Sequence, residues 1–336
     1  MTVGVHQRPA PGASPNPFLF LCGCPRSGTT LLRRMLNAHR EVAVAPSIGW
    51  LAAGSPDGRG LTRDGFVTPA FLDAYVRRPQ PFGRNRVPFS RTDLDALLAA
   101  GPLHYADFVA WVLDLYGQVR GKRYVGTKTW PAAGDSPALN ERWPHAAVLH
   151  LVRDGRDTAL SLLAWRRADK LARFATWEHD PIATAALWWE WHVRVIQDLA
   201  AAARPGRAYE LRYELLVAEP ERECAALCRF LGVPYDPAMV RYHEGRTIDD
   251  PSLDAKHAWL APTPGLRDWR REMAPRDVER FEAVAGGLLE ELGYPLGSEP
   301  SEEARERAAW LRALFVPRGP VPNGWRSPVQ VSGGAR

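Results

Sequence analysis

The chain has 336 residues, enough for one large domain or two modest ones with a core that needs no staples. Hydrophobic residues make up 46% and charged residues 24%, which excludes wholesale disorder. The 43 basic and 38 acidic residues leave a net charge of +5, which permits an anionic ligand without indicating nucleic acid. No apolar run approaches the roughly 20 residues that a membrane-spanning helix needs. The chain has four cysteines, Cys22, Cys24, Cys224 and Cys228. They are too few for a disulfide framework and are interpreted as buried free thiols of a cytoplasmic protein.

Apolar runs alternate with helical patterns along the chain, which favours an α/β fold with a central parallel sheet of about five strands. The strands are expected at Phe18–Cys22, Val42–Ala45, Tyr124–Thr127, Ala147–Val152 and Ala208–Arg212. The helices are expected at Thr29–His39, Asp157–Arg167, Ile182–Ala203, Pro220–Leu231, Pro275–Leu292 and Ser301–Leu314. The last of these helices are expected to form a helical C-terminal portion.

Residues 18–316 are expected to form a single domain. Residues 1–17 are rich in Pro, Gly, Ala and Ser and predict a flexible leader, and residues 317–336 predict a tail of the same kind. Residues 52–102 hold many Gly, Pro and Arg residues and few periodic segments. This stretch is therefore expected to be an irregular, variable insertion over one edge of the sheet.

The stretch FLFLCGCPRSGTTLL, which begins at residue 18, joins a buried strand to an amphipathic helix through a tight turn. Gly23, Gly28 and the two threonines that follow copy the spacing of the P-loop, G-x-x-x-x-G-K-[ST]. Backbone N–H groups of such a turn converge on an anion. Thr29 stands in the place of the P-loop lysine, and Arg26 is the cation inside the loop. The loop spacing predicts a P-loop-type three-layer domain. Kinases and ATPases place the lysine on the β- and γ-phosphates, so its replacement by Thr29 indicates a ligand with a different terminal group.

The stretch AAVLHLVRDGRDTALS, which begins at residue 146, forms a second strand, turn and helix. Arg153 falls at the carboxyl end of the strand, where open α/β sheets bind ligands. Ser161 lies in the next helix, so a guanidinium and a hydroxyl could clamp a second phosphate. Two alternatives stay open. Arg153 and Asp154 could form local salt bridges, or Asp154 could be a Walker B aspartate for magnesium.

Several segments together resemble the family of sulfotransferases that use 3′-phosphoadenosine-5′-phosphosulfate (PAPS), most closely its bacterial and tyrosylprotein-type branch. They are the loop PRSGTTLL, the KT after the third strand, LVRDGRDTALS, LRYELLVAEPERECAALCRFLGVPYDP, and the ending WRREM with FEAVAGGLLEELGY. The resemblance covers about residues 18–51 and 105–295. It implies transfer of a sulfuryl group to a hydroxyl, or secondarily an amine, of a secondary metabolite, lipid or glycan, without a metal.

The resemblance also implies roles for individual residues. Those that match the loop around the 5′-phosphosulfate are Arg26, Ser27, Gly28, Thr29 and Thr30. Those that match the 3′-phosphate site are Arg153 and Ser161. Those that match the C-terminal segment closing over the cofactor are Arg267, Trp269, Arg270 and Arg271. Tyr213 matches a tyrosine beside the nucleotide, and Lys128 matches a lysine that reaches the transferring group, so Lys128 and Arg26 are the expected catalytic cations.

The general bases familiar from relatives are missing from their usual places. Ser47 stands where relatives often carry a glutamate, and Trp130 where others carry a histidine. Three explanations compete: a base from elsewhere, an acceptor acidic enough to need little help, or loss of activity. Asp135 and His179 with Asp180 are the candidate bases, although Asp135 could equally be a cap and His179 a surface residue.

Two other functions are considered. A P-loop kinase using ATP is disfavoured by Thr29. A non-catalytic module that binds nucleotides, anions or nucleic acid is disfavoured by the alternating charges of RDVERFE and SEEARERAAW.

Four tryptophans are expected mostly in the core, with one or two of them lining an acceptor pocket. They are Trp177, Trp188, Trp189 and Trp191.

Overall fold

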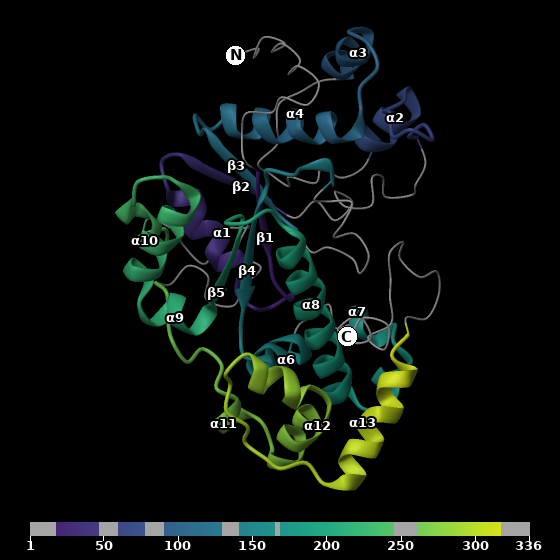
Figure 1. Ribbon diagram of the computed structural model, residues 1–336, viewed down its shortest axis with the longest axis vertical. Helices are drawn as coiled ribbons and strands as arrows, with labels where there is room; N and C mark the ends of the chain where they lie inside the picture. Colours follow the sequence, from purple (N-terminus) through teal and green to yellow (C-terminus); the bar gives the residue numbers. More distant parts are fainter. Residues whose placement is uncertain are drawn as a thin grey trace.

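A central parallel sheet organises the computed structural model, which describes residues 18–46, 60–77, 91–129, 141–164, 169–244 and 261–316. Within these residues the five strands run in the order β2-β3-β1-β4-β5 (Figure 1). They are β1 (Leu19–Cys22), β2 (Val42–Ala45), β3 (Tyr124–Lys128), β4 (Ala147–Val152) and β5 (Ala208–Arg212). The predicted α/β fold class and sheet are confirmed, and every strand end lies within one residue of its expected place. The expected leader and tail lie outside the described residues.

Helices cover both faces of the sheet, as the short apolar strands require. Along β1, Phe20 and Cys22 belong to the core that α4 (Tyr105–Gln118) and α8 (Pro181–Ala202) share. Leu19 and Leu21 point to the opposite face, because successive side chains of a strand alternate. The helices on that face are α1 (Thr29–Ala38), α9 (Tyr213–Ala218) and α10 (Pro220–Leu231).

The helical C-terminal portion packs around one end of α8, beyond the carboxyl ends of the strands (Figure 1). Its helices are α11 (Trp269–Glu272), α12 (Pro275–Glu291) and α13 (Glu302–Leu314), which meet α6 (Gly155–Leu163) and η1 (Ala175–Glu178). The short α7 (Asp169–Ala172) packs against η1 and α8. A short η2 (Pro237–Met239) lies against α1. Helix α6 begins two residues before its expected start, because the Asp154 side chain accepts from the backbone N–H of Arg156 and caps it. No helix of the described ranges is long and apolar enough to cross a membrane.

Three helices longer than six residues in the described ranges were not predicted, and neither were the short α7, α9 and α11. Helix α4 is buried on almost every side, so its sequence lacks the polar face that marks an amphipathic helix. The stretch 52–102 was expected to be an irregular insertion, and its described part holds α2 (Pro69–Arg77) and α3 (Arg91–Ala99). Helix α2 carries a start signal, since the Thr68 hydroxyl accepts from the backbone N–H of Phe71 and Pro69 follows directly.

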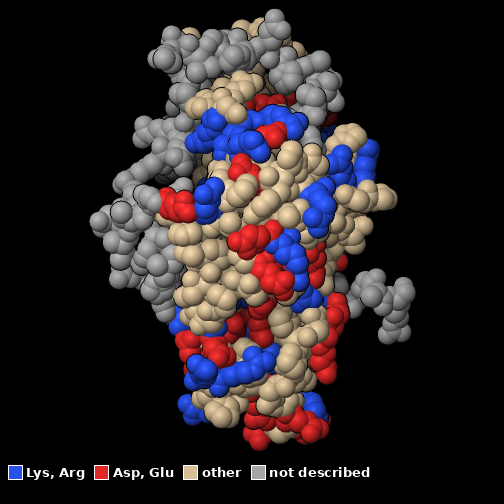
Figure 2. Space-filling model, turned by 90° about the vertical axis from the view of Figure 1, so that its left-hand side faces the viewer, with Lys and Arg blue, Asp and Glu red and all other residues tan. Residues whose placement is uncertain are grey.

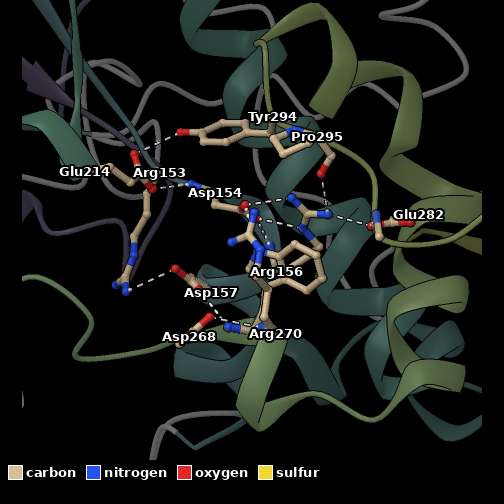
Figure 3. Close-up of polar contacts among 12 residues, drawn as sticks. Arg153, Asp154, Arg156, Asp157, Glu214, Asp268, Arg270, Glu282, Tyr294 and Pro295 are labelled. Carbon is tan, nitrogen blue, oxygen red and sulfur yellow. Dashed lines mark hydrogen bonds and ion pairs between the residues drawn. The ribbon is translucent and has the colours of Figure 1, made fainter.

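A fully buried ionic network ties the C-terminal portion to the end of β4 (Figure 3). The guanidinium of Arg156, which is 0% exposed, donates to both carboxylate oxygens of Asp154 at 3.0 and 2.8 Å. It also donates to Glu282 of α12 at 2.5 Å. Glu282 in turn accepts from the backbone N–H groups of Gly297 and Ser298, at 2.9 and 2.8 Å. Two distant parts of the chain therefore compensate one buried positive charge.

Glu282→Ala should lower the free energy of unfolding by about 3–5 kcal/mol, because the buried guanidinium of Arg156 would lose one of its two carboxylates. Glu291→Ala is the control on the same helix. Glu291 pairs with Arg194 at 2.7 Å at the surface, where such a pair contributes at most about 1 kcal/mol. Urea unfolding of both variants checks the prediction, and equal losses would contradict it.

Candidate functional site

The loop between β1 and α1 is a tight turn built from residues with unusual backbone angles. Gly28 has φ 98° and precedes α1, and Arg26 has φ 77°, the one positive φ of a described non-glycine residue. Gly23 has no room for a side chain, since a Cβ there would lie 2.7 Å from Thr29 Cγ2 and 2.8 Å from Leu151 O. The predicted P-loop shape is therefore present, with the start of α1 facing into the loop.

The structure brings the two predicted anion sites into contact. Arg26 Nε donates to Ser161 Oγ of α6 at 3.1 Å, and Arg153 Nη1 lies 3.5 Å from the carbonyl oxygen of Arg26. The Arg153 guanidinium lies 4.3 Å over the ring of Tyr213, at the start of α9. This ring packs against Gly28 so closely that a Cβ would collide with it. Five predicted cofactor residues thus lie together at the strand ends.

Two buried donors of this site have no hydrogen-bond partner within the described ranges. They are Nε of Arg153 and Oγ of Ser27. Arg153 is only 6% exposed and Ser27 only 1%. Because buried polar groups are nearly always paired in folded proteins, an unpaired guanidinium nitrogen and hydroxyl beside a P-loop-like turn indicate a site for an anion.

Lys128 lies at the end of β3, next to β1 in the sheet, where Leu21 and Lys128 are register partners. Its Nζ donates to Thr30 Oγ1 in the first turn of α1 at 3.3 Å. The expected catalytic lysine therefore stands beside the loop, because the carboxyl ends of neighbouring parallel strands meet at one edge.

Asp157 was not predicted as a site residue, and it contacts the second anion site. Its Oδ2 lies 3.9 Å from Nη2 of Arg153, and it also accepts from the backbone N–H of Trp269 at 2.8 Å. Burial raises the pKa of Asp157 to about 6; Arg153 opposes the rise, and Asp154 and Glu214 add to it. The i,i+4 spacing from Arg153 was the signal in the sequence that could have revealed this pair.

Asp154 has a structural role rather than that of the alternative Walker B aspartate. It caps α6, binds Arg156 and accepts from Nε1 of Trp269 at 3.1 Å. Both of its oxygens are thus engaged with the protein, and local salt bridges, the other alternative, are formed at Arg153 and Arg156.

Trp269 was expected to belong to a segment that closes over the cofactor. Its indole is instead buried, 6% exposed, with the guanidinium of Arg156 3.7 Å over the ring. The guanidinium of Arg270 lies 4.5 Å over the same ring, and Arg267 pairs with a carboxylate of the same turn at 2.7 Å. Trp269 therefore anchors α11, and cofactor contact by this segment stays a prediction.

Of the candidate general bases, two lie in the described part of the chain and one lies outside it. The positions outside the described residues are Ser47, Trp130 and Asp135. His179 is exposed, and its ring packs edge-on against Trp310 of α13 with centroids 5.0 Å apart. Asp180 is buried and caps α8 by accepting from the backbone N–H of Ala183 at 3.0 Å. Both described candidates thus have structural roles.

The tryptophans of α8 lie in the core, as expected for most of them. Trp188, Trp189 and Trp191 are at most 8% exposed, and Trp177 packs partly buried against the same core. Trp189 also serves the site, because its Nε1 donates to the carbonyl oxygen of Arg153 at 3.1 Å and fixes the backbone there.

Comparison with known proteins assigns the chain to a family. A model described as the sulfotransferase family matches residues 17–237. Protein-tyrosine sulfotransferase 1 of Danio rerio is 26% identical over 86% of this chain and 75% of its own. Nodulation protein NoeE of Sinorhizobium fredii is 27% identical over 87% of this chain and 69% of its own. The chain therefore belongs to the sulfotransferase family.

Solved structures show the same fold at lower identity. The sulfotransferase domain of the Synechococcus PCC 7002 olefin synthase has a TM-score of 0.54 and 23% identity, over 87% of this chain and 97% of that domain. The sulfotransferase domain from the curacin biosynthetic pathway has a TM-score of 0.53 and 20% identity, over 84% and 99%. These likenesses concern the arrangement of the sheet and its helices.

Gly28→Ala should destabilise the protein by about 1 kcal/mol more than Gly206→Ala, because both positions have positive φ but only Gly28 is packed against a ring. Gly206 has φ 74° and open space around it, so its variant measures the backbone cost alone. Denaturant unfolding gives both values. Equal losses would show that contact with Tyr213 does not require a glycine.

Proposed function

We propose that the protein transfers a sulfuryl group from PAPS to a hydroxyl group of an acceptor. The observation that carries the proposal is the meeting of two anion sites, one at the β1–α1 loop and one at Arg153 and Ser161. PAPS has a phosphosulfate on its 5′ oxygen and a phosphate on its 3′ oxygen, so it needs two such sites at a fixed separation. Membership of the sulfotransferase family supports the same reaction.

In this proposal the loop holds the 5′-phosphosulfate. Its members are Arg26, Ser27, Gly28, Thr29 and Thr30. The unpartnered hydroxyl of Ser27 and the N–H groups at the start of α1 donate to the anion. Arg153, with its unpartnered Nε, and Ser161 hold the 3′-phosphate, and Tyr213 lies beside the nucleotide. Arg267 and Arg270 approach the cofactor from the turn that Trp269 anchors.

The acceptor oxygen would attack the sulfur in line while the bond from sulfur to the 5′-phosphate oxygen breaks. Lys128 and Arg26 would neutralise the charge that develops on that oxygen, which is the largest contribution a preorganised site offers. Two cationic side chains would thus do what a metal ion does in kinases. Relatives named as protein-tyrosine sulfotransferases support a hydroxyl acceptor, because tyrosine offers a phenolic hydroxyl. A secondary metabolite, lipid or glycan is proposed as the acceptor, with an amine as the second choice.

The cell compartment is proposed from the state of the cysteine thiols, and the absence of a nucleic-acid partner from the distribution of surface charge. All four cysteines are free and buried, which supports a reducing, cytoplasmic compartment. Acidic and basic side chains are interspersed over the described part of the face shown in Figure 2, so this part offers no continuous basic stripe to a nucleic acid.

Arg153→Ala should weaken binding of adenosine 3′,5′-bisphosphate (PAP) by about 30- to 1000-fold, the effect of losing a charge-assisted contact of about 2–4 kcal/mol. Adenosine 5′-phosphate (AMP) lacks the 3′-phosphate, so its affinity should change little. Titration calorimetry with both ligands, without metal, tests this. Equal weakening of both would remove Arg153 from the 3′-phosphate site, and tighter binding of Mg·ATP than PAP by the wild type would favour a kinase.

Lys128→Ala should slow turnover about 10²–10³-fold while leaving the affinity for PAP nearly unchanged, because the lysine acts mainly on charge that appears in the transition state. Transfer of labelled sulfate from PAPS to an acceptor found by a pooled screen measures turnover. Retention of near-normal turnover would refute the catalytic role. A parallel loss of PAP affinity would make Lys128 a ligand of the ground state instead.

A further inference from the structure

The guanidinium of Arg153 already has an anion beside it. Asp157 lies four residues after Arg153, in the first turn of α6, with its Oδ2 3.9 Å from Nη2 of Arg153 (Figure 3). Both side chains are shielded from water, since 7% of the Arg153 side chain and 14% of the Asp157 side chain are exposed. Their mutual attraction is therefore screened far less than that of a surface pair.

The carboxylate is held where it is. Asp157 Oδ1 accepts from the backbone N–H of Trp269 at 2.8 Å, and Trp269 is itself fixed through its Nε1 by Asp154 at 3.1 Å. Asp157 would have to break the first of these contacts to move away from an incoming anion. A phosphate that reaches Arg153 would therefore meet a carboxylate that stays in place.

The charges around Asp157 are unevenly distributed. Arg153 is the positive group that favours its ionised form, whereas Asp154 of the same turn and Glu214 of α9 disfavour it. From α11, the N–H of Trp269 also favours the ionised form. Burial is the largest effect and raises the pKa of Asp157 to about 6, and a further negative charge nearby would raise this pKa more.

We propose that Asp157 is the resident counter-ion of Arg153 and that it limits how tightly this arginine holds a 3′-phosphate. In the empty enzyme the carboxylate neutralises a buried guanidinium. In the complex it opposes the phosphate until it takes up a proton from solvent. The benefit is in turnover: PAPS and the product PAP share the 3′-phosphate, so tight binding of this group would slow product release without accelerating the chemical step. The proposal rests on the 3′-phosphate role proposed for Arg153.

Asp157→Asn tests the proposal, because the amide can still accept from the N–H of Trp269 but carries no charge. At pH 8 the variant should bind PAP about three- to tenfold more tightly than the wild type and bind AMP within about twofold of it. Asp277→Asn, which removes the same charge from the first turn of α12, is the control and should change neither affinity. Titration calorimetry measures all the dissociation constants.

The wild type alone provides a second measurement, which holds even if the variant does not fold. Its preference for PAP over AMP should rise as pH falls from 8 to about 6.5, because protonation of Asp157 removes the repulsion. Protonation of the 3′-phosphate itself, with a pKa of about 6, works in the opposite direction, so the sign identifies the group. Asp157→Asn should abolish the rise.

The outcomes separate the two proposals. If the wild type does not prefer PAP to AMP, the 3′-phosphate role of Arg153 is wrong. If the wild type prefers PAP but Asp157→Asn binds it equally or more weakly, Arg153 keeps its role and the counter-ion proposal is overturned. A wild-type preference that is flat or falls between pH 8 and 6.5 overturns it as well.

Discussion

The buried guanidinium of Arg156 is the constraint on which the site depends. A charge removed from water is tolerated only when other groups compensate it fully. Asp154 and Glu282 supply the two carboxylates, and the carbonyl oxygen of Pro295 accepts another of its hydrogen bonds at 3.0 Å. Because these partners come from the β4–α6 turn, from α12 and from the chain after α12, the helical C-terminal portion can dock in one way only.

The same network determines where the donors of the anion site point. Glu214 accepts from the backbone N–H of Asp154 at 2.9 Å and from the hydroxyl of Tyr294 at 3.1 Å. The turn that carries Arg153 and the turn that carries Tyr213 are thereby joined to each other and to the chain after α12. A site held in this way does not have to reorganise when an anion arrives, and such preorganisation is how proteins stabilise charge.

A few charged side chains at the site, rather than the net charge of the whole chain, determine its electrostatic potential. The net charge of +5 is small for 336 residues, and the proposed ligand-binding cations are three side chains at the strand ends, Arg26, Lys128 and Arg153. One of them, Arg153, has an acidic neighbour in Asp157. Under the proposal for Arg153 and Asp157, a polyanionic ligand with two separate phosphate groups is attracted strongly and is still released after the reaction.

Features encoded locally could be predicted from the sequence. The five strands, the loop from Gly23 to Thr30 and the place of Arg153 at a strand end follow from apolar runs and glycine spacing within a few residues. Helix α4 escaped prediction because burial on nearly every side removes the polar face that marks a helix. The orientation of Trp269 and its contact with Asp157 were decided by the tertiary structure alone. Trp269 is 112 residues away in sequence from Asp157, which accepts its backbone N–H, and no local pattern specifies such a contact. Only packing of α11 and α12 against α6 brings these groups within hydrogen-bonding distance.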